Sequence, residues 1–119
     1  MKTLLYVDDE EINRELFQLT FESKFNVVTA HSGNDALKII NTTPQINAIV
    51  SDMKMPGMNG IEFIKKAKNS LPDVPCFLLS GFDLNDEIKN ALNEKVINHF
   101  FSKPMRINEI IDKIENSDI

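Results

Sequence analysis

Five short runs of mainly apolar residues alternate with five segments in which apolar residues recur at helical spacing, and this alternation limits the possible folds more than any other feature. The runs are rich in β-branched, aromatic and leucine residues, which predicts strands, at Thr3–Val7, Asn26–Ala30, Ala48–Ser51, Cys76–Leu79 and His99–Phe101. Helices are predicted between and after them, marked by Ile12, Leu16 and Leu19; Ala36, Leu37 and Ile40; Ile61, Ile64 and Leu71; Ile88, Ala91 and Leu92; and Ile107, Ile110, Ile111 and Ile114. Alternation of this kind forms right-handed βαβ units. We therefore predict an α/β fold with a mostly parallel sheet that is covered by helices on both faces.

The composition is that of a soluble globular domain, with 42% apolar and 26% charged residues. The 119 residues suffice for one domain with a sizeable core, and we expect residues 1–119 to form it. A net charge of −5 disfavours direct nucleic-acid binding, which needs a basic patch. No apolar run approaches the ~20 residues of a membrane span, and no signal peptide is evident, so we expect a cytoplasmic protein. The single cysteine, Cys76, lies in an apolar run and is expected in the core.

Polar residues follow four of the predicted strands. Asp8 and Asp9 follow the first strand, Asp52 the third, Ser80 the fourth and Lys103 the fifth. Because the carboxyl ends of parallel strands lie along one edge of a sheet, these side chains are expected to converge there. A structural alternative exists for the acids, since acidic residues also stabilise helix N-termini and open turns.

The convergence of these residue types indicates phosphoryl chemistry. Three neighbouring carboxylates repel one another and need a cation, and Mg²⁺ accepts carboxylate oxygens while it keeps waters for a phosphate. A carboxylate can attack phosphorus and form an aspartyl phosphate. The Lys103 ammonium would neutralise charge on the phosphoryl group, and the Ser80 hydroxyl would donate a hydrogen bond to one of its oxygens.

Asp8-Asp9, Asp52 with the loop Met55–Gly60, Ser80, and Lys103-Pro104 together resemble the receiver domain of bacterial response regulators. The resemblance implies the flavodoxin-like (βα)5 fold, with strand order 2-1-3-4-5. It implies that Asp52 is the phosphoacceptor, that Lys103 contacts the phosphoryl group, and that the Lys103–Pro104 peptide bond is cis. The implied Mg²⁺ ligands are Asp8, Asp9, Asp52 and the backbone carbonyl of Met53.

The same resemblance implies a conformational switch. Ser80 and Phe100 stand at the positions of the family's hydroxyl and aromatic switch residues, so phosphorylation of Asp52 would change the face formed by the last two helices and the last strand. Lys54 and Phe82 lie where the family tunes the lifetime of the aspartyl phosphate, and we expect these bulky side chains to slow hydrolysis. Asn98 and His99 replace the paired acids that receivers dimerising through this face often carry.

The function predicted from these residues is a signalling switch rather than an enzyme. Its phosphodonor would be a histidine kinase or a phosphotransfer protein, and its output an unidentified partner or effector domain. Whether the chain is a complete single-domain regulator or the receiver of a longer protein stays open. A metal-dependent phosphatase of the haloacid-dehalogenase type also forms an aspartyl phosphate, but Glu10 stands where its second aspartate is expected. A flavodoxin-like electron carrier is disfavoured because the acids at 8–11 would repel the phosphate of FMN.

Overall fold

The computed structural model of the chain describes residues 1–43, 45–81 and 84–117, and within them five strands alternate with five helices. The strands are β1 Thr3–Val7, β2 Asn26–Ala30, β3 Ala48–Asp52, β4 Cys76–Ser80 and β5 His99–Ser102. The helices are α1 Glu11–Phe21, α2 Gly33–Thr42, α3 Gly60–Ala67, α4 Asp86–Asn93 and α5 Ile107–Glu115. All predicted strands are confirmed, and β3, β4 and β5 each extend one residue further than predicted.

The sheet is parallel throughout and has the predicted strand order β2-β1-β3-β4-β5. The chain turns to β2 on one side of β1 and then crosses to β3 on the other side. In the register of the β1–β3 pair, Val7 lies opposite Ser51. The next residue on each strand is an aspartate, so Asp8 and Asp52 leave the sheet side by side at the point where the strand order reverses, the usual ligand-binding position in open α/β sheets.

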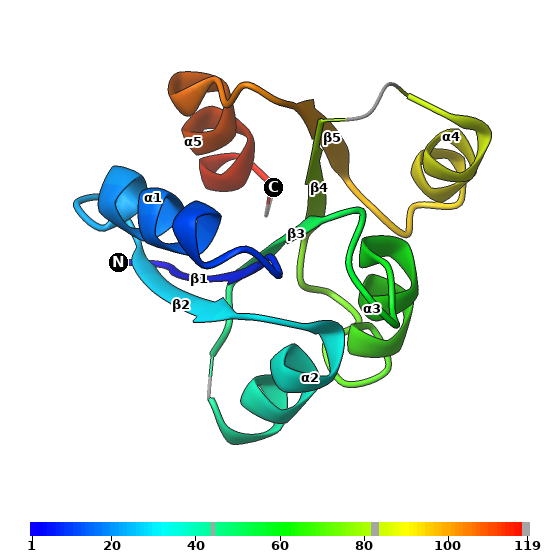
Figure 1. Cartoon of the computed structure of the whole chain (residues 1–119), viewed down its shortest axis with the longest axis horizontal. Helices are drawn as coiled ribbons and strands as arrows, with labels where there is room; N and C mark the ends of the chain where they lie inside the picture. Colours follow the sequence, from blue (N-terminus) through cyan, green and yellow to red (C-terminus); the bar gives the residue numbers. More distant parts are fainter. Residues whose placement is uncertain (44, 82–83, 118–119) are drawn as a thin grey trace.

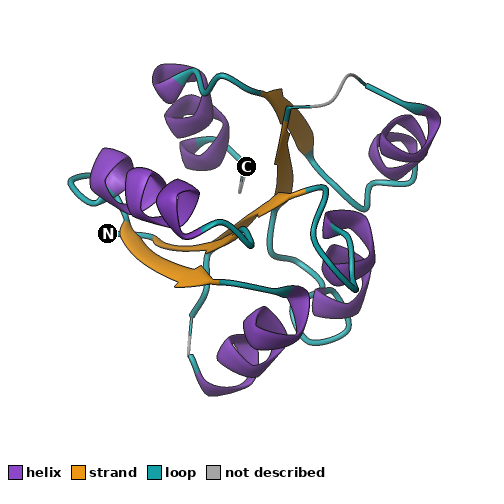
Figure 2. Ribbon diagram, in the orientation of Figure 1, coloured by secondary structure: helices purple, strands orange, loops and turns teal. Residues whose placement is uncertain are grey.

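Helices cover both faces of the sheet, as Figures 1 and 2 show. Alternate residues of each strand point to opposite faces, so Leu4 and Tyr6 of β1 face α1 and α5, while Leu5 and Val7 face the other three helices. The core on the α1/α5 side is rich in aromatic residues, and the core on the α2/α3/α4 side is mainly aliphatic. Cys76 is buried on the second side as predicted, and burial raises the pKa of its thiol to about 11.

The side chains that α1 buries are not those whose spacing predicts the helix. Ile12, Leu16 and Leu19 are 70%, 51% and 68% exposed, whereas Phe17 and Phe21 are fully buried. The ring of Phe17 stacks on that of Tyr6 in β1, with centroids 3.9 Å apart and an interplanar angle of 1°. Two aromatic rings one helical turn apart bury more apolar area than the aliphatic stripe would, and this decides which face of α1 meets the sheet.

Two other helices differ from the sequence prediction in detail. Helix α3 ends at Ala67, so Leu71 packs against the core from the following turn rather than from the helix. In α5, Ile110 and Ile114 are buried, but Ile107 is 46% exposed because it lies at the first turn of the helix. The longest of the described helices, α1, has 11 residues, and none of them is long and apolar enough to cross a bilayer.

Helix α3 begins directly beside the end of β3. Asn59 and Glu62 form a reciprocal cap in which each side-chain oxygen accepts the other residue's backbone N–H, both at 2.9 Å. The N–H of Gly60 donates to the carbonyl of Met53 at 2.8 Å. A Cβ atom at Gly60 would clash with the carbonyl oxygen of Asp52 and lie 2.8 Å from a methyl group of Leu78. Glycine is therefore required where α3 approaches the strand that carries Asp52.

Replacing Gly60 with alanine is expected to lower the free energy of unfolding by about 1–3 kcal/mol, since the added methyl group must displace the backbone of β3. Urea denaturation would measure the change. Gly81→Ala is the matched control, because among the described residues outside its chain neighbours the nearest atom to a Cβ there is the Cδ of Lys103 at 4.0 Å. A Gly60→Ala protein as stable as Gly81→Ala would contradict this account of the contact.

Candidate functional site

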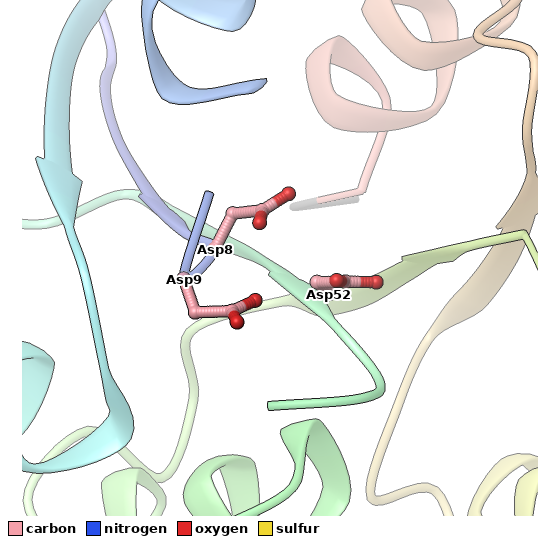
Figure 3. A group of neighbouring side chains, drawn as sticks. All are labelled: Asp8, Asp9 and Asp52. Atoms are coloured by element: carbon pink, nitrogen blue, oxygen red, sulfur yellow. The ribbon is translucent and has the colours of Figure 1, made fainter. Parts of the chain in front are cut away.

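Three aspartates meet at the carboxyl edge of the sheet. Asp8 and Asp9 follow β1, Asp52 is the last residue of β3, and each offers a carboxylate oxygen within 4.8 Å of the other two. Figure 3 shows the three side chains leaving the ends of the two neighbouring strands close together. Asp8 is fully buried, Asp52 is half-buried and Asp9 is exposed, so one side of the group is open to solvent. The predicted convergence of these acids is confirmed.

The Asp8 carboxylate is held by hydrogen bonds on both oxygens. Its Oδ1 accepts the backbone N–H of Glu10 at 2.9 Å, and its Oδ2 accepts the hydroxyl of Tyr6 at 2.7 Å. The carbonyl oxygen of Asp8 accepts a hydrogen bond from the guanidinium of Arg14 on α1 at 2.9 Å. A buried carboxylate with a donor on each oxygen is held in one orientation.

The Asp52 carboxyl lies in an environment that resists its charge. Burial, which penalises the charged form, and the nearby Asp8 and Asp9 raise the pKa of Asp52 from the usual 3.8 to about 6. The Lys103 ammonium and the backbone N–H of Met53, which donates to Asp52 Oδ1 at 2.9 Å, act in the opposite direction. The carboxylate side chain is 13% exposed, so an incoming group can reach it from solvent.

Lys103 reaches the acids from the neighbouring side of the sheet edge. Its Nζ lies 3.7 Å from Asp52 Oδ1 and 3.9 Å from Asp8 Oδ2. Its backbone N–H donates to the carbonyl of Ser80 at 2.9 Å, which ties the end of β5 to the end of β4. The Lys103–Pro104 peptide bond is cis, as predicted. The structure therefore brings Lys103 together with Asp8 and Asp52.

The group fits a small hard cation. Three carboxylates at this spacing repel one another in the absence of positive charge. Their donors are all oxygens, which suits Mg²⁺ better than the softer metals that select cysteine or histidine. The carbonyl oxygen of Met53, the fourth predicted ligand, accepts the N–H of Gly60, and a carbonyl has a second lone pair.

The remaining predicted residues lie around this group. Ser80, the last residue of β4, is fully buried. Phe100 of β5 is half-buried and packs against the core on the α2/α3/α4 side, in register with Leu78. Lys54 is exposed and lines a surface pocket together with Asp9, Glu10, Met55 and Pro56. Phe82, the second predicted tuning residue, lies outside the described residues.

Asn98 and His99, which replace the paired acids of some receivers, have local partners. Asn98 accepts the N–H of Cys76 through its side-chain oxygen at 2.9 Å, and its own N–H donates to the carbonyl of Cys76 at 2.7 Å. His99 Nε2 lies 3.6 Å from Glu109 Oε1 on α5. These contacts tie β5 to β4 and to α5.

The sequence prediction misses the two residues that support Asp8. It places Tyr6 in a strand without a further role, and it does not single out Arg14. One signal for Tyr6 is available, because residues two apart on a strand share a face and a buried tyrosine hydroxyl needs a partner. Burial, the hydrogen bond to Asp8 and the charge of that carboxylate raise the pKa of Tyr6 far above its usual value.

Comparison with known proteins finds one family and many relatives. The family model described as the response regulator receiver domain matches residues 4–115. The hydrogenase transcriptional regulatory protein HoxA of Cupriavidus necator is 29% identical over 97% of this chain, which covers 24% of HoxA. The two-component response regulator ORR5 of Oryza sativa is 30% identical over 90% of this chain, which covers 81% of ORR5. The chain thus spans about a quarter of HoxA but most of ORR5.

Solved structures give the same picture of the fold. A chain described as an adenylate cyclase from Rhodopirellula baltica matches with a TM-score of 0.92 at 30% identity, covering 98% of this chain and 87% of that one. The response regulator TrrA of Thermotoga maritima, solved in complex with Mg²⁺–BeF, matches with a TM-score of 0.82 at 26% identity over 97% of both chains. The chemotaxis protein CheY4 of Vibrio cholerae, at 24% identity and a TM-score of 0.86, shares the fold.

Proposed function

Since the chain belongs to the response regulator receiver domain family, we propose that it is a phosphorylation-dependent signalling switch whose phosphoacceptor is Asp52. The observation that carries the proposal is the placement of Asp52 beside two kinds of charge. Two further carboxylates lie within 4.8 Å of it, and the Lys103 ammonium lies 3.7 Å from its Oδ1 and 3.9 Å from Asp8 Oδ2. A phosphoryl group delivered to Asp52 would meet both the ammonium and a cation held by the carboxylates.

Receiver domains typically bind Mg²⁺ at an acidic pocket, and Asp8, Asp9 and Asp52 form such a group in this chain. We assign these carboxylates as the protein ligands, with the Met53 carbonyl as a fourth. When bound, Mg²⁺ would neutralise negative charge on the phosphoryl oxygens. The complex of TrrA with Mg²⁺–BeF supports this assignment, because a related chain of the same fold takes up both groups.

The chain's own residues supply the nucleophile and much of the positioning. An oxygen of the Asp52 carboxylate attacks phosphorus and forms an O–P bond while the bond from phosphorus to the donor's histidine nitrogen breaks, and that nitrogen leaves with the bonding electrons. Lys103 neutralises charge on the transferring group, and the Ser80 hydroxyl donates to one of its oxygens. Hydrolysis would later return the carboxylate, and exposed Lys54, two residues beyond Asp52, is proposed to hinder the attacking water.

The output of the switch is proposed to be the face formed by α4, β5 and α5. Ser80 would move toward the phosphoryl oxygen, and Phe100 would rotate into the space that it leaves. Phe100 is half-buried at the edge of the core, so a rotation of its ring would change how much of this face is apolar. The partner or effector domain that reads this face is unidentified.

The phosphodonor is proposed to be a histidine kinase or a phosphotransfer protein. Lys103, Leu16 and Met105 line one pocket beside the site, so the ammonium that would contact the phosphoryl group and an exposed apolar side chain of α1 share a surface. Ile12 and Leu19, which lie about one turn to either side of Leu16 on α1, are also exposed and extend this surface along the helix. Exposed apolar stripes of this kind are typical of protein-binding surfaces.

The proposal predicts that the protein takes up one phosphoryl group when it is incubated with acetyl phosphate and Mg²⁺. Intact-mass spectrometry would detect the adduct, and NMR with beryllofluoride would detect the stable mimic. Asp52→Asn and chelation of Mg²⁺ are each expected to abolish uptake, because the first removes the nucleophile and the second its counter-charge. A phosphoryl group found on another residue, or phosphoryl uptake by Asp52→Asn equal to that of the wild type, would overturn the assignment of Asp52 as the phosphoacceptor.

A further inference from the structure

One polar contact inside the aromatic core points at the acidic group. The hydroxyl of Tyr6 donates to Asp8 Oδ2 at 2.7 Å, and both residues are buried, with Tyr6 2% and Asp8 0% exposed. Residues two apart on a strand point to the same face, so the ring lies directly behind the carboxylate. Bulk water therefore has little access to replace this donor.

The tyrosine ring is itself held in place. It stacks on Phe17 with centroids 3.9 Å apart and nearly parallel planes, and Phe17 packs in turn on Phe21. A ring fixed at this stack leaves its hydroxyl one direction, toward Asp8. The position of the hydroxyl is thus set by the packing of α1 on the sheet.

Asp8 Oδ2 also lies near a second donor. The Lys103 ammonium is 3.9 Å away, which is too long for a hydrogen bond but close enough to attract the carboxylate. The backbone N–H of Glu10 holds only the other oxygen, Oδ1. Without the tyrosine hydroxyl, Oδ2 would be able to rotate toward Lys103, and the carboxylate would leave the orientation in which one of its oxygens lies within 4.8 Å of oxygens of Asp9 and Asp52.

We propose that Tyr6 is a positioning residue for the metal site, which holds the Asp8 carboxylate in the orientation that binds a divalent cation. The inference rests on the Mg²⁺ site of the proposed function. Donors to metal-ligating carboxylates orient the ligand, and their loss typically weakens metal binding about 10–100-fold.

Tyr6→Phe tests the proposal, because it removes the hydroxyl and keeps the ring that stacks on Phe17. We expect Mg²⁺ binding to the unphosphorylated protein, measured by isothermal titration calorimetry, to weaken about tenfold or more. Ile114→Val is the matched control. Ile114 is fully buried in the same core cluster, so this variant loses core packing and is expected to keep the wild-type affinity.

The wild-type protein carries its own second readout. Tyr6 is the single tyrosine of the chain, and there is no tryptophan, so tyrosine fluorescence reports on this hydroxyl alone. We expect Mg²⁺ to change that fluorescence with the same midpoint that calorimetry gives. This measurement keeps the proposal testable should Tyr6→Phe fold poorly.

The outcomes distinguish the metal site from the role of Tyr6 in it. A wild type that binds no Mg²⁺ would overturn both the metal site and the role of Tyr6. If the wild type binds Mg²⁺ and the Tyr6→Phe variant binds it with equal affinity, only the role of Tyr6 would be overturned. The same conclusion would follow if Ile114→Val weakened Mg²⁺ binding equally, or if the tyrosine fluorescence did not change when Mg²⁺ binds.

Discussion

Replacing Lys103 with methionine is expected to slow the phosphorylation of Asp52 by about 10²–10³-fold, the usual effect of removing one preorganised group that stabilises charge in a transition state. Methionine is unbranched and of similar length, so the change removes the ammonium and retains most of the apolar stem. The initial rate of adduct formation with acetyl phosphate and Mg²⁺, followed by mass spectrometry, would measure the effect.

The reason for the large effect is the position of the ammonium. Its Nζ lies 3.7 Å from Asp52 Oδ1 and 3.9 Å from Asp8 Oδ2, and a phosphoryl group on Asp52 would bring further negative charge to the same place. The backbone at Lys103 is anchored, because its N–H donates to the carbonyl of Ser80 at the end of β4. The ammonium is thus positioned before the phosphoryl group arrives.

Mg²⁺ binding should not be weakened by Lys103→Met, and this separates a role of Lys103 in phosphoryl transfer from a role in metal binding. Lys103 is a cation beside the carboxylates proposed to hold Mg²⁺, so its removal is expected to leave the Mg²⁺ affinity unchanged or to raise it. Lys113→Met, at an exposed position of α5, controls for the loss of one surface charge. Wild-type phosphorylation by Lys103→Met, or a loss of phosphorylation matched by an equal loss of Mg²⁺ binding, would contradict the assignment.

The convergence of Asp8, Asp52 and Lys103 could be predicted from the sequence because it depends on strand ends alone. Asp8 and Asp52 directly follow short predicted strands and Lys103 lies two residues beyond another, and a parallel sheet places all such ends on one edge. Alternation of strands and helices determines that the sheet is parallel, so no side-chain packing had to be known. The strand order came from the resemblance, since alternation alone is compatible with other orders.

Features that depend on competition between side chains could not be predicted in this way. Helix α1 has two apolar stripes, and only the stacking of Phe17 on Tyr6 shows which of them is buried. The reciprocal cap of Asn59 and Glu62 lies in a stretch interpreted as a turn, because asparagine before glycine is typical of turns and of helix starts alike. The hydrogen bond from Tyr6 to Asp8 follows from burial, which a single sequence does not give.

In the absence of divalent cations, Asp52→Asn is expected to be more stable than the wild type by about 3 kcal/mol near pH 7.5. The pKa of Asp52 is raised from 3.8 to about 6 in the folded protein, which is about two units, and each unit corresponds to about 1.36 kcal/mol. At this pH the wild type must keep a charged carboxylate where burial and two neighbouring acids oppose it. Asparagine has nearly the same shape and carries no charge. Urea denaturation with a chelator present would measure the difference.

The pH dependence follows from the sign of the shift. A carboxyl whose pKa is higher in the folded than in the unfolded state binds its proton more tightly when folded, so the wild type loses stability as the pH rises through the interval from 3.8 to about 6. Below this interval Asp52 is protonated in both states and resembles asparagine. The advantage of Asp52→Asn should therefore shrink to about 1 kcal/mol near pH 4.5.

Added Mg²⁺ should reverse the order of the two proteins, and this links their stability to the proposed function. A cation that binds only the folded state stabilises it in proportion to the logarithm of its concentration over its dissociation constant, and Asp52→Asn has lost one of the three carboxylates. Asp73→Asn, at an exposed position in the connection from α3 to β4, is the control for removing one acid and should show neither effect. An Asp52→Asn protein with no gain in stability under chelation, or with the same gain near pH 4.5 and pH 7.5, would mean that the folded chain does not hold Asp52 as an unfavourable charge. Unfavourable charge at Asp52 would then no longer support the proposed Mg²⁺ site at this edge of the sheet.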